Sequence, residues 1–240
     1  MSGDLFPQIP TFMQALQKAG YVTYGIGKFH YNQTYPWSTP RGCGMDLVVG
    51  EQGEQSFGYD FVWETAGKQQ TVSNYCFYCD YLQKKGMLDQ VRDFFEQCGG
   101  PNGDVPHHNF DKAMPWPFAE EDYIDVVTGR VAREQLSRHP AEKPFYMKVS
   151  FCGPHKPYDA PQRYLDMFPL EQEDDFLLPE GQVIAQKDKE ALWRQRRSSK
   201  AMIKLIDDQI GEILRLLEKR GMMEDTLVLF TSDHGDMLGD

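Results

Sequence analysis

The sequence lacks long apolar runs and is short of positive charge. No stretch approaches the roughly 18 consecutive apolar residues of a membrane-spanning helix, and Met1 to Phe6 do not resemble a signal peptide. Lys and Arg together number 25 against 36 Asp and Glu, for a formal net charge of −11. Because nucleic acids and anionic membranes are bound through clustered Lys and Arg, this balance argues against both as partners. Any anionic ligand must be held by a few local cations.

The number of cysteines is small and odd, so they cannot all pair in a disulfide framework. The chain has five, so any pairing scheme leaves one over: Cys43, Cys76, Cys79, Cys98 and Cys152. Cys76 and Cys79 have the spacing of a zinc-ligand pair, but no second pair accompanies them. Their aromatic neighbours favour small buried thiols instead. A disulfide from this pair to Cys98 or Cys43 stays open for an oxidising compartment.

What the chain does contain is three apolar runs, each followed at once by polar side chains capable of chemistry. They are Tyr21 to Gly27 ahead of Lys28 and His30, Pro144 to Phe151 ahead of His155, and Thr226 to Phe230 ahead of Asp233 and His234. Each run is predicted to be a buried strand. Because open α/β sheets bind ligands at the carboxyl ends of their strands, the three clusters are expected to meet.

The meeting of cations, imidazoles and a carboxylate suits an anionic tetrahedral substrate. Asp233 and His234, side by side, are candidates to share one divalent metal. The competing interpretations are a polar turn after the last strand and histidines that only cap or cover the surface.

Helical patterns alternate with these runs and predict an α/β sandwich. Thr11 begins a helix as a capping-box residue with Gln14, and Gly20 ends it. Further helices are expected at about 120–138 and 187–220. Residues from about 31 to 118 are rich in Gly, Pro, Tyr and Trp, with one helix near 80–98, and are predicted to be a loop-rich insertion that walls a pocket.

Together these segments resemble the sulfatase family of the alkaline phosphatase superfamily, and they occur in the family's order. The matching segments are Ala19 to Lys28 with His30, Lys143 to Met147 with Gly153 to Pro157, Leu205 to Gly211, and Ser232 to Gly235. The sequence Gly153 to Pro157 around His155 resembles that of iduronate-type sulfatases, whereas the last nine residues resemble choline sulfatases and phosphonate monoester hydrolases. The resemblance implies a three-layer α/β/α fold with a mixed central sheet. It also implies one domain over residues 1–240, incomplete at both ends.

The resemblance assigns a role to each site residue. It implies that Lys28 neutralises sulfate oxygens and holds the nucleophile, that His30 hydrogen-bonds the nucleophile, and that His155 faces the substrate and its leaving group. Asp233 and His234 are implied to be metal ligands. Displacement at sulfur or phosphorus needs charge stabilisation on the peripheral oxygens, a metal to polarise one of them, and an acid for the departing alcohol. Oxygen-rich ligation favours calcium, and the imidazole keeps manganese open.

The chain departs from the family pattern at the nucleophile. The family's Cys/Ser-x-Pro/Ala-x-Arg motif, oxidised to formylglycine in sulfatases, has no counterpart in residues 1–240. Cys152 imitates it, but it lies in the segment that matches the family's histidine and lacks the arginine. The chain is therefore expected to be the middle of a larger enzyme and inactive alone.

The expected parent is a metal-dependent sulfatase that cleaves a sulfate ester, with a sugar ester as one candidate. The alternatives are a phosphonate or phosphate ester hydrolase of the same superfamily, and a non-catalytic fragment that binds anions through Lys28 and His155. The family is compatible with an exported, periplasmic or lysosomal location, and the sequence selects none of these. A chain without a central strand should expose sheet edges, which predicts association into homo-oligomers.

Overall fold

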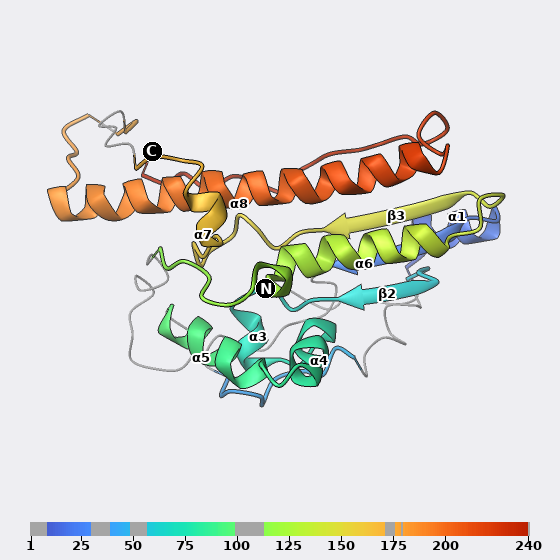
Figure 1. Ribbon diagram of the computed structural model, residues 1–240, viewed down its shortest axis with the longest axis horizontal. Helices are drawn as coiled ribbons and strands as arrows, with labels where there is room; N and C mark the ends of the chain where they lie inside the picture. Colours follow the sequence, from blue (N-terminus) through green and yellow to red (C-terminus); the bar gives the residue numbers. More distant parts are fainter. Residues whose placement is uncertain are drawn as a thin grey trace.

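A three-stranded parallel sheet lies at the centre of the molecule. The computed structural model describes residues 9–29, 39–48, 57–98, 113–170, 176–178 and 180–239. Its strands lie in the order β2-β1-β3 and comprise β1 (Val22–Gly27), β2 (Phe61–Glu64) and β3 (Phe145–Ser150). Gly27 is opposite both Glu64 and Ser150, so the carboxyl ends of all three strands share one edge. The arrows of β2 and β3 point the same way in Figure 1. The antiparallel strand that a mixed sheet requires is not among the described residues.

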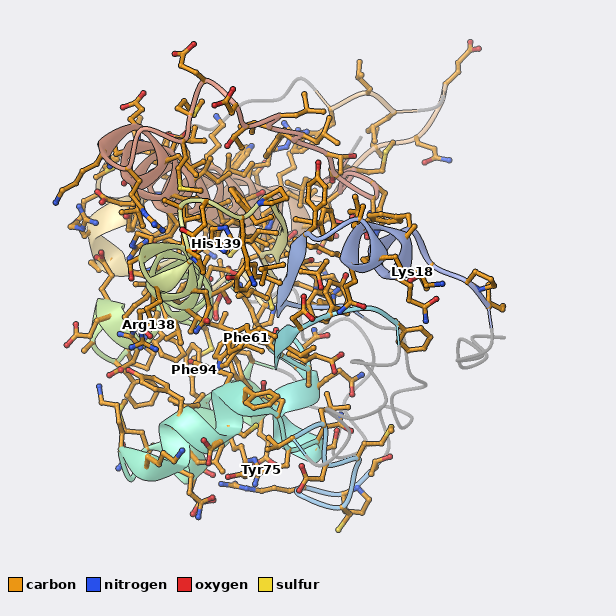
Figure 2. The ribbon with its side chains drawn as sticks, turned by 90° about the vertical axis from the view of Figure 1, so that its right-hand side faces the viewer. Lys18, Phe61, Tyr75, Phe94, Arg138 and His139 are labelled. Carbon is orange, nitrogen blue, oxygen red and sulfur yellow. The ribbon has the colours of Figure 1, made fainter. Side chains whose placement is uncertain are left out.

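Alternation along the strands builds an apolar cluster on each face of the sheet. Tyr24 and Ile26 of β1 belong to the larger cluster, which helix α6 (Ile124–Arg138) shares. On the other face, helix α1 (Phe12–Lys18) packs the Phe12 ring edge-on against Tyr146 of β3, with ring centroids 5.1 Å apart. The strands accordingly lie between α6 and α1 (Figure 2). Helix α8 (Gln186–Lys219) packs along α6 and completes the helical layer (Figure 1).

Local sequence signals account for the helix boundaries. Thr11 caps α1 in the predicted capping box with Gln14, and Gly20 follows with a φ of 90°. The region near 80–98 forms two helices where one was predicted, α4 (Phe77–Lys84) and α5 (Leu88–Gln97). Gly86, at a φ of 69°, separates them, because only glycine adopts that conformation without strain. The short elements are α3 (Gln70–Ser73), η2 (Glu120–Asp122) and α7 (Gln162–Leu165).

The loop-rich interpretation of residues 31–118 misses strand β2. Only four residues of this strand pair, and they pair with β1 alone. So short a run has no periodicity that distinguishes it from an apolar loop. The strand matters because its end, Thr65 to Gln69, reaches the same edge as Lys28.

The prediction of a buried strand at Thr226–Phe230 is wrong. In the structure this run pairs with no strand, and Leu227, Leu229 and Phe230 are each more than 80% exposed. The segment instead runs back along α8, where Arg196 Nε donates to the Leu238 carbonyl at 3.0 Å (Figure 1). An apolar run forms a strand only where a neighbouring strand offers hydrogen bonds, and no described strand lies next to it.

The exposed run predicts self-association of this chain. Burial of one Leu or Phe side chain is worth about 1.5–3 kcal/mol. Replacing Leu229 and Phe230 by lysine is therefore expected to weaken association by at least about tenfold, measured by sedimentation velocity over a concentration series. Val183, 92% exposed outside the run, provides the control Val183→Lys. A wild-type chain that stays monomeric throughout the series would contradict the prediction.

No helix in the described part of the chain combines the length and apolar character needed to cross a membrane.

Candidate active site

Lys28 lies where the three strand ends meet. Its backbone N–H donates to the Ser150 carbonyl at 3.0 Å, and the Thr65 N–H donates to the Gly27 carbonyl at 2.9 Å, so pairing continues one residue past each strand. The Lys28 side chain then crosses Gly67, where an added Cβ would lie 3.5 Å from both Cδ and Cε. Gly67 has a φ of 88°, so the turn that lies against Lys28 depends on glycine.

The charge of Lys28 reaches three other predicted site residues. The pKa of His155 is lowered, first by burial and also by the charges of Lys28 and Lys68. The pKa of Asp233 is lowered, first by the hydrogen bond from the His234 N–H and in part by Lys28. Lys28 also opposes the rise in the pKa of His234, whose main cause is the hydrogen bond to the Gly235 carbonyl. The positive charge of Lys28 thus acts on His155, Asp233 and His234. His30 lies outside the described residues.

His155 is half-buried in a defined tautomeric state. Its Nδ1 lies 2.7 Å from the carbonyl oxygen of Lys156. Because a carbonyl can only accept, Nδ1 carries the proton, and Nε2 of the neutral ring keeps its lone pair. The neutral form dominates at pH 7, since the pKa lies below the usual 6.5.

Asp125 anchors the segment that leads to His155. This carboxylate, in the first turn of α6, accepts hydrogen bonds from the backbone N–H groups of Cys152 at 2.6 Å and Gly153 at 3.0 Å. Burial raises its pKa, and the charge of Lys68 and the two N–H donors oppose that rise. Sequence reasoning missed Asp125 because an acidic residue in a first turn is ordinary helix chemistry.

Lys68 anchors the same segment beyond His155. Its Nζ lies 2.5 Å from Asp159 Oδ1 and 3.2 Å from the Pro157 carbonyl, and both charged side chains are almost fully buried. The Tyr123 hydroxyl donates to Asp159 Oδ1 at 2.8 Å. Two buried charges therefore hold the His155 segment: Asp125 of α6 binds the backbone ahead of His155, and Lys68, in the turn after β2, binds the residues that follow it. Lys68 lies in no motif, so no sequence signal marks it.

Removal of Lys68 is expected to cost about 3 kcal/mol of unfolding free energy. Lys68→Met leaves Asp159 as a buried charge without its cation, and such losses are large. Lys84→Met is the matched control, because Lys84 is 74% exposed in its pair with Asp80 and such surface pairs contribute about 0.2–1 kcal/mol. Urea unfolding of both variants measures the difference. Equal losses would show that the buried pair contributes no more than the surface pair.

Asp233 and His234 offer an incomplete metal shell. Asp233 Oδ2 and His234 Nε2 lie 3.6 Å apart, close enough to approach one ion, and both side chains are largely exposed. The carboxylate oxygen suits either calcium or manganese. The imidazole nitrogen suits manganese better than calcium. No group of three or more His, Cys, Asp or Glu side chains in the described ranges could hold a metal ion. The two residues therefore fit part of a coordination sphere.

Cys152 lies at the site as a buried thiol. Burial raises its pKa to about 12, with the Asp125 charge as a further cause. Its Sγ lies 3.3 Å from Thr65 Oγ1. A protonated, buried sulfur is a poor nucleophile, in keeping with the interpretation of the sequence.

Comparison with known proteins identifies relatives of the whole chain. The family model described as "Sulfatase" matches residues 3–240. An arylsulfatase of Clostridium perfringens is 31% identical over 248 residues, which cover 96% of this chain and 47% of the relative. A choline-sulfatase of Rhizobium meliloti is 34% identical over 265 residues, which cover 97% of this chain and 43% of the relative.

A solved structure shows the same fold at lower identity. The phosphonate monoester hydrolase of Agrobacterium radiobacter aligns with a TM-score of 0.63 at 20% identity, over 99% of this chain and 49% of that chain. This chain spans about half the length of the curated relatives it matches.

Proposed function

This chain belongs to the sulfatase family, and from that premise we propose that the whole sulfatase, with its nucleophile supplied outside residues 1–240, hydrolyses sulfate esters where Lys28 and His155 meet. The α/β fold of the alkaline phosphatase and sulfatase type, expected from the sequence, is confirmed by the solved structures. The observation that carries the proposal is the pairing of β1 with β3, which brings Lys28 to the start of the His155 segment: the Lys28 N–H donates to the Ser150 carbonyl at 3.0 Å. The arylsulfatase and the choline-sulfatase, each more than 30% identical over at least 96% of this chain, support sulfate over phosphonate as the reacting group.

Two side chains of this chain act on the ester in the proposed reaction. The Lys28 ammonium stabilises the negative charge on the peripheral oxygens of the sulfate group. The bound anion favours the imidazolium form of His155, because a nearby negative charge raises the pKa of a histidine. Protonated Nε2 then donates to the oxygen of the departing alcohol. Asp125 and Lys68 hold the His155 segment in place during this transfer.

Asp233 and His234 are the residues proposed to hold a divalent metal: calcium, which the oxygen-rich shell expected from the family favours, with manganese as the alternative that the imidazole suits. A bound ion would polarise a sulfate oxygen as a Lewis acid. The family's formylglycine nucleophile corresponds to no residue of this chain. His30 is proposed, by resemblance alone, to hydrogen-bond that group.

The acid role of His155 predicts a falling pH profile. Because the acid must be protonated, kcat/KM is expected to fall about tenfold per pH unit above the pKa of His155 in the free protein. That pKa lies below 6.5, chiefly because burial disfavours the imidazolium form. Steady-state kinetics from acid to neutral pH measure the slope. In His155→Gln the slope should vanish; a slope that persists in this variant would assign the acid to another residue.

The proposal is tested by the hydrolysis of an aryl sulfate and an aryl phosphonate under the same conditions. The purified protein, with its intact mass determined first, is assayed with calcium or manganese present. Faster turnover of the sulfate supports the proposal, and faster turnover of the phosphonate overturns it in favour of the phosphonate hydrolase. Sulfate binding without turnover of either ester would indicate a non-catalytic, anion-binding chain.

A further inference from the structure

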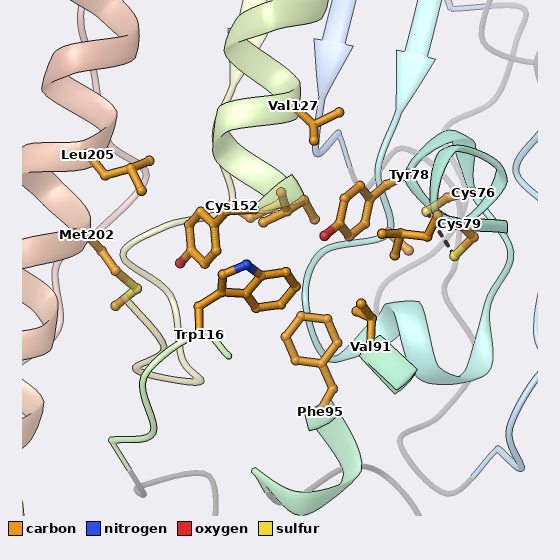
Figure 3. Close-up of a cluster of buried hydrophobic side chains, with 14 of the residues drawn as sticks. Cys76, Tyr78, Cys79, Val91, Phe95, Trp116, Val127, Cys152, Met202 and Leu205 are labelled. Atoms are coloured by element: carbon orange, nitrogen blue, oxygen red, sulfur yellow. Dashed lines mark hydrogen bonds between the residues drawn. The ribbon is translucent and has the colours of Figure 1, made fainter. Parts of the chain in front are cut away.

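Two buried cysteines lie next to each other, close to the loop from Thr65 to Lys68 that contacts Lys28. Cys76 precedes helix α4 and Cys79 lies in its first turn, both fully buried. Their sulfurs are 3.5 Å apart (Figure 3). We propose that Cys76 and Cys79 are a redox-active dithiol whose reversible disulfide alters the loop from Thr65 to Lys68.

The geometry needs little change to form the bond. A disulfide requires about 2.05 Å between sulfurs, so the two must approach by about 1.5 Å, within the range of side-chain rotation. The other cysteines are placed differently: Cys98 lies 3.9 Å from the Met114 sulfur, Cys152 contacts Thr65, and Cys43 is exposed. A zinc site is not indicated, since the described residues supply no third ligand to the pair.

A buried cation lies beside the Cys79 sulfur and favours a negative charge on the dithiol. The Arg92 side chain, 8% exposed, donates from Nε to the Thr71 carbonyl and from Nη2 to the Asn74 carbonyl, both at 3.1 Å. Cys79 Sγ lies 3.8 and 3.5 Å from the same two carbonyls. No carboxylate of the described residues pairs with Arg92, so its charge is balanced only by carbonyl dipoles. A thiolate in this dithiol would supply the missing negative charge.

The pKa values of the two thiols are shifted in opposite directions. Burial alone would raise the pKa of Cys76. The hydrogen bond from the Cys79 thiol, and those from the N–H groups of Ala66, Cys79 and Tyr78, outweigh burial and lower it to about 7. The pKa of Cys79 is raised, first by its bond to Cys76 and then by burial. Cys76 is therefore the attacking thiolate and Cys79 the resolving thiol.

A hydroperoxide is the oxidant class that balances the step. The Cys76 thiolate attacks one peroxide oxygen and becomes a sulfenic acid, while the other oxygen leaves as hydroxide. The Cys79 sulfur then displaces the sulfenic oxygen as water and forms the S–S bond. Two thiols are oxidised and one peroxide is reduced; hydrogen peroxide yields two water molecules, and an organic hydroperoxide yields one alcohol and one water. Because both sulfurs are buried, a small peroxide reaches them more readily than a bulky disulfide.

The bond is coupled to the site through Thr71. The Cys79 sulfur lies 3.8 Å from the Thr71 carbonyl, and Thr71 donates to the Gly67 carbonyl from its hydroxyl at 2.7 Å and from its N–H at 3.1 Å. Gly67 is the residue that Lys28 crosses. A disulfide sulfur has no proton to donate, so oxidation removes one donor from the buried Thr71 carbonyl and loosens the loop. The effect on catalysis depends on the proposed function, whereas the disulfide and the loop change do not.

Oxidation of the native protein by hydrogen peroxide tests the bond. After quenching, the protein is unfolded and alkylated, so that burial no longer protects any thiol. Three of the five cysteines should be alkylated rather than all five, with the bond mapped to the peptide that contains Cys76 and Cys79. Dithiothreitol should restore all five. Cys76→Ser and Cys79→Ser should each prevent the loss, while Cys98→Ser should leave it unchanged.

Hydrogen exchange of the wild-type protein tests the coupling without any variant. The peptide that contains Gly67 and Thr71 should exchange about tenfold faster after oxidation, as expected for one weakened buried hydrogen bond, and recover on reduction. Five alkylated cysteines after peroxide, or a bond that maps to Cys43, Cys98 or Cys152, would overturn the dithiol. A bond between Cys76 and Cys79 with unchanged exchange would overturn the coupling. Each readout is independent of sulfate turnover.

Discussion

Replacement of Lys28 by alanine is expected to lower kcat/KM for an aryl sulfate by about 10²–10³-fold. This range is the usual cost of losing one preorganised group that stabilises transition-state charge. Lys28 is the lysine whose charge acts on His155, Asp233 and His234 together. Its side chain is only half-buried and lies against Gly67, so the folding free energy should change little.

Lys18→Ala is the control for the loss of one positive charge. Lys18 is exposed at the end of α1 (Figure 2) and should leave kcat/KM unchanged. Circular dichroism and thermal unfolding of both variants separate a loss of charge from a loss of fold. A Lys28→Ala protein that keeps the wild-type fold and more than about a tenth of its kcat/KM would remove Lys28 from the proposed site.

Replacement of Gly27 by alanine is expected to destabilise the protein by about 4 kcal/mol or more. Gly27 ends β1 at a φ of 105°, and an added Cβ would overlap the Ser150 backbone carbonyl, lying 2.7 Å from its carbon. Backbone cannot rotate away as a side chain can, so β1 and β3 must separate where Lys28 begins. Urea unfolding measures the loss, and the same variant should lose turnover because Lys28 is displaced.

Gly20→Ala isolates the clash from the conformational strain. Gly20 also has a positive φ, 90°, but nothing lies within 4 Å of an added Cβ. Its expected cost is the left-handed strain alone, about 1–2 kcal/mol. Equal losses at the two positions would show that the approach of β1 to β3 is not tight at Gly27.

Elements with strong local signals could be predicted from the sequence. The capping box at Thr11, the positive-φ glycine at Gly20, strands β1 and β3, and the three-to-four-residue spacing of α8 each depend on neighbours within a few residues. The two strands that pair directly also bring Lys28 and the His155 segment together, since parallel strands share their carboxyl edge. This part of the candidate site follows from the order of the elements.

The last apolar run and strand β2 show that a local sequence pattern does not decide whether a segment forms a strand. Thr226–Phe230 has a stronger strand pattern than Phe61–Glu64, yet the first is exposed and unpaired while the second lies in the sheet. Strand formation depends on a partner that satisfies the backbone hydrogen bonds, and a partner is a property of the whole fold. Asp233 and His234 are therefore largely exposed, in a segment that runs back along α8 (Figure 1).

The sequence by itself determined the family, the helices α1, α6 and α8, and the two strand ends that carry Lys28 and His155, because short-range patterns and an ordered set of motifs encode them. Only the tertiary structure decided which buried groups support the site. Lys68 meets Asp159 across 91 residues, and Asp125 meets the Cys152 backbone across 27. These residues carry no local signature in the sequence. Whether a charged side chain stabilises the neighbouring backbone depends on its burial and on its distance to a partner, and residue type alone reveals neither.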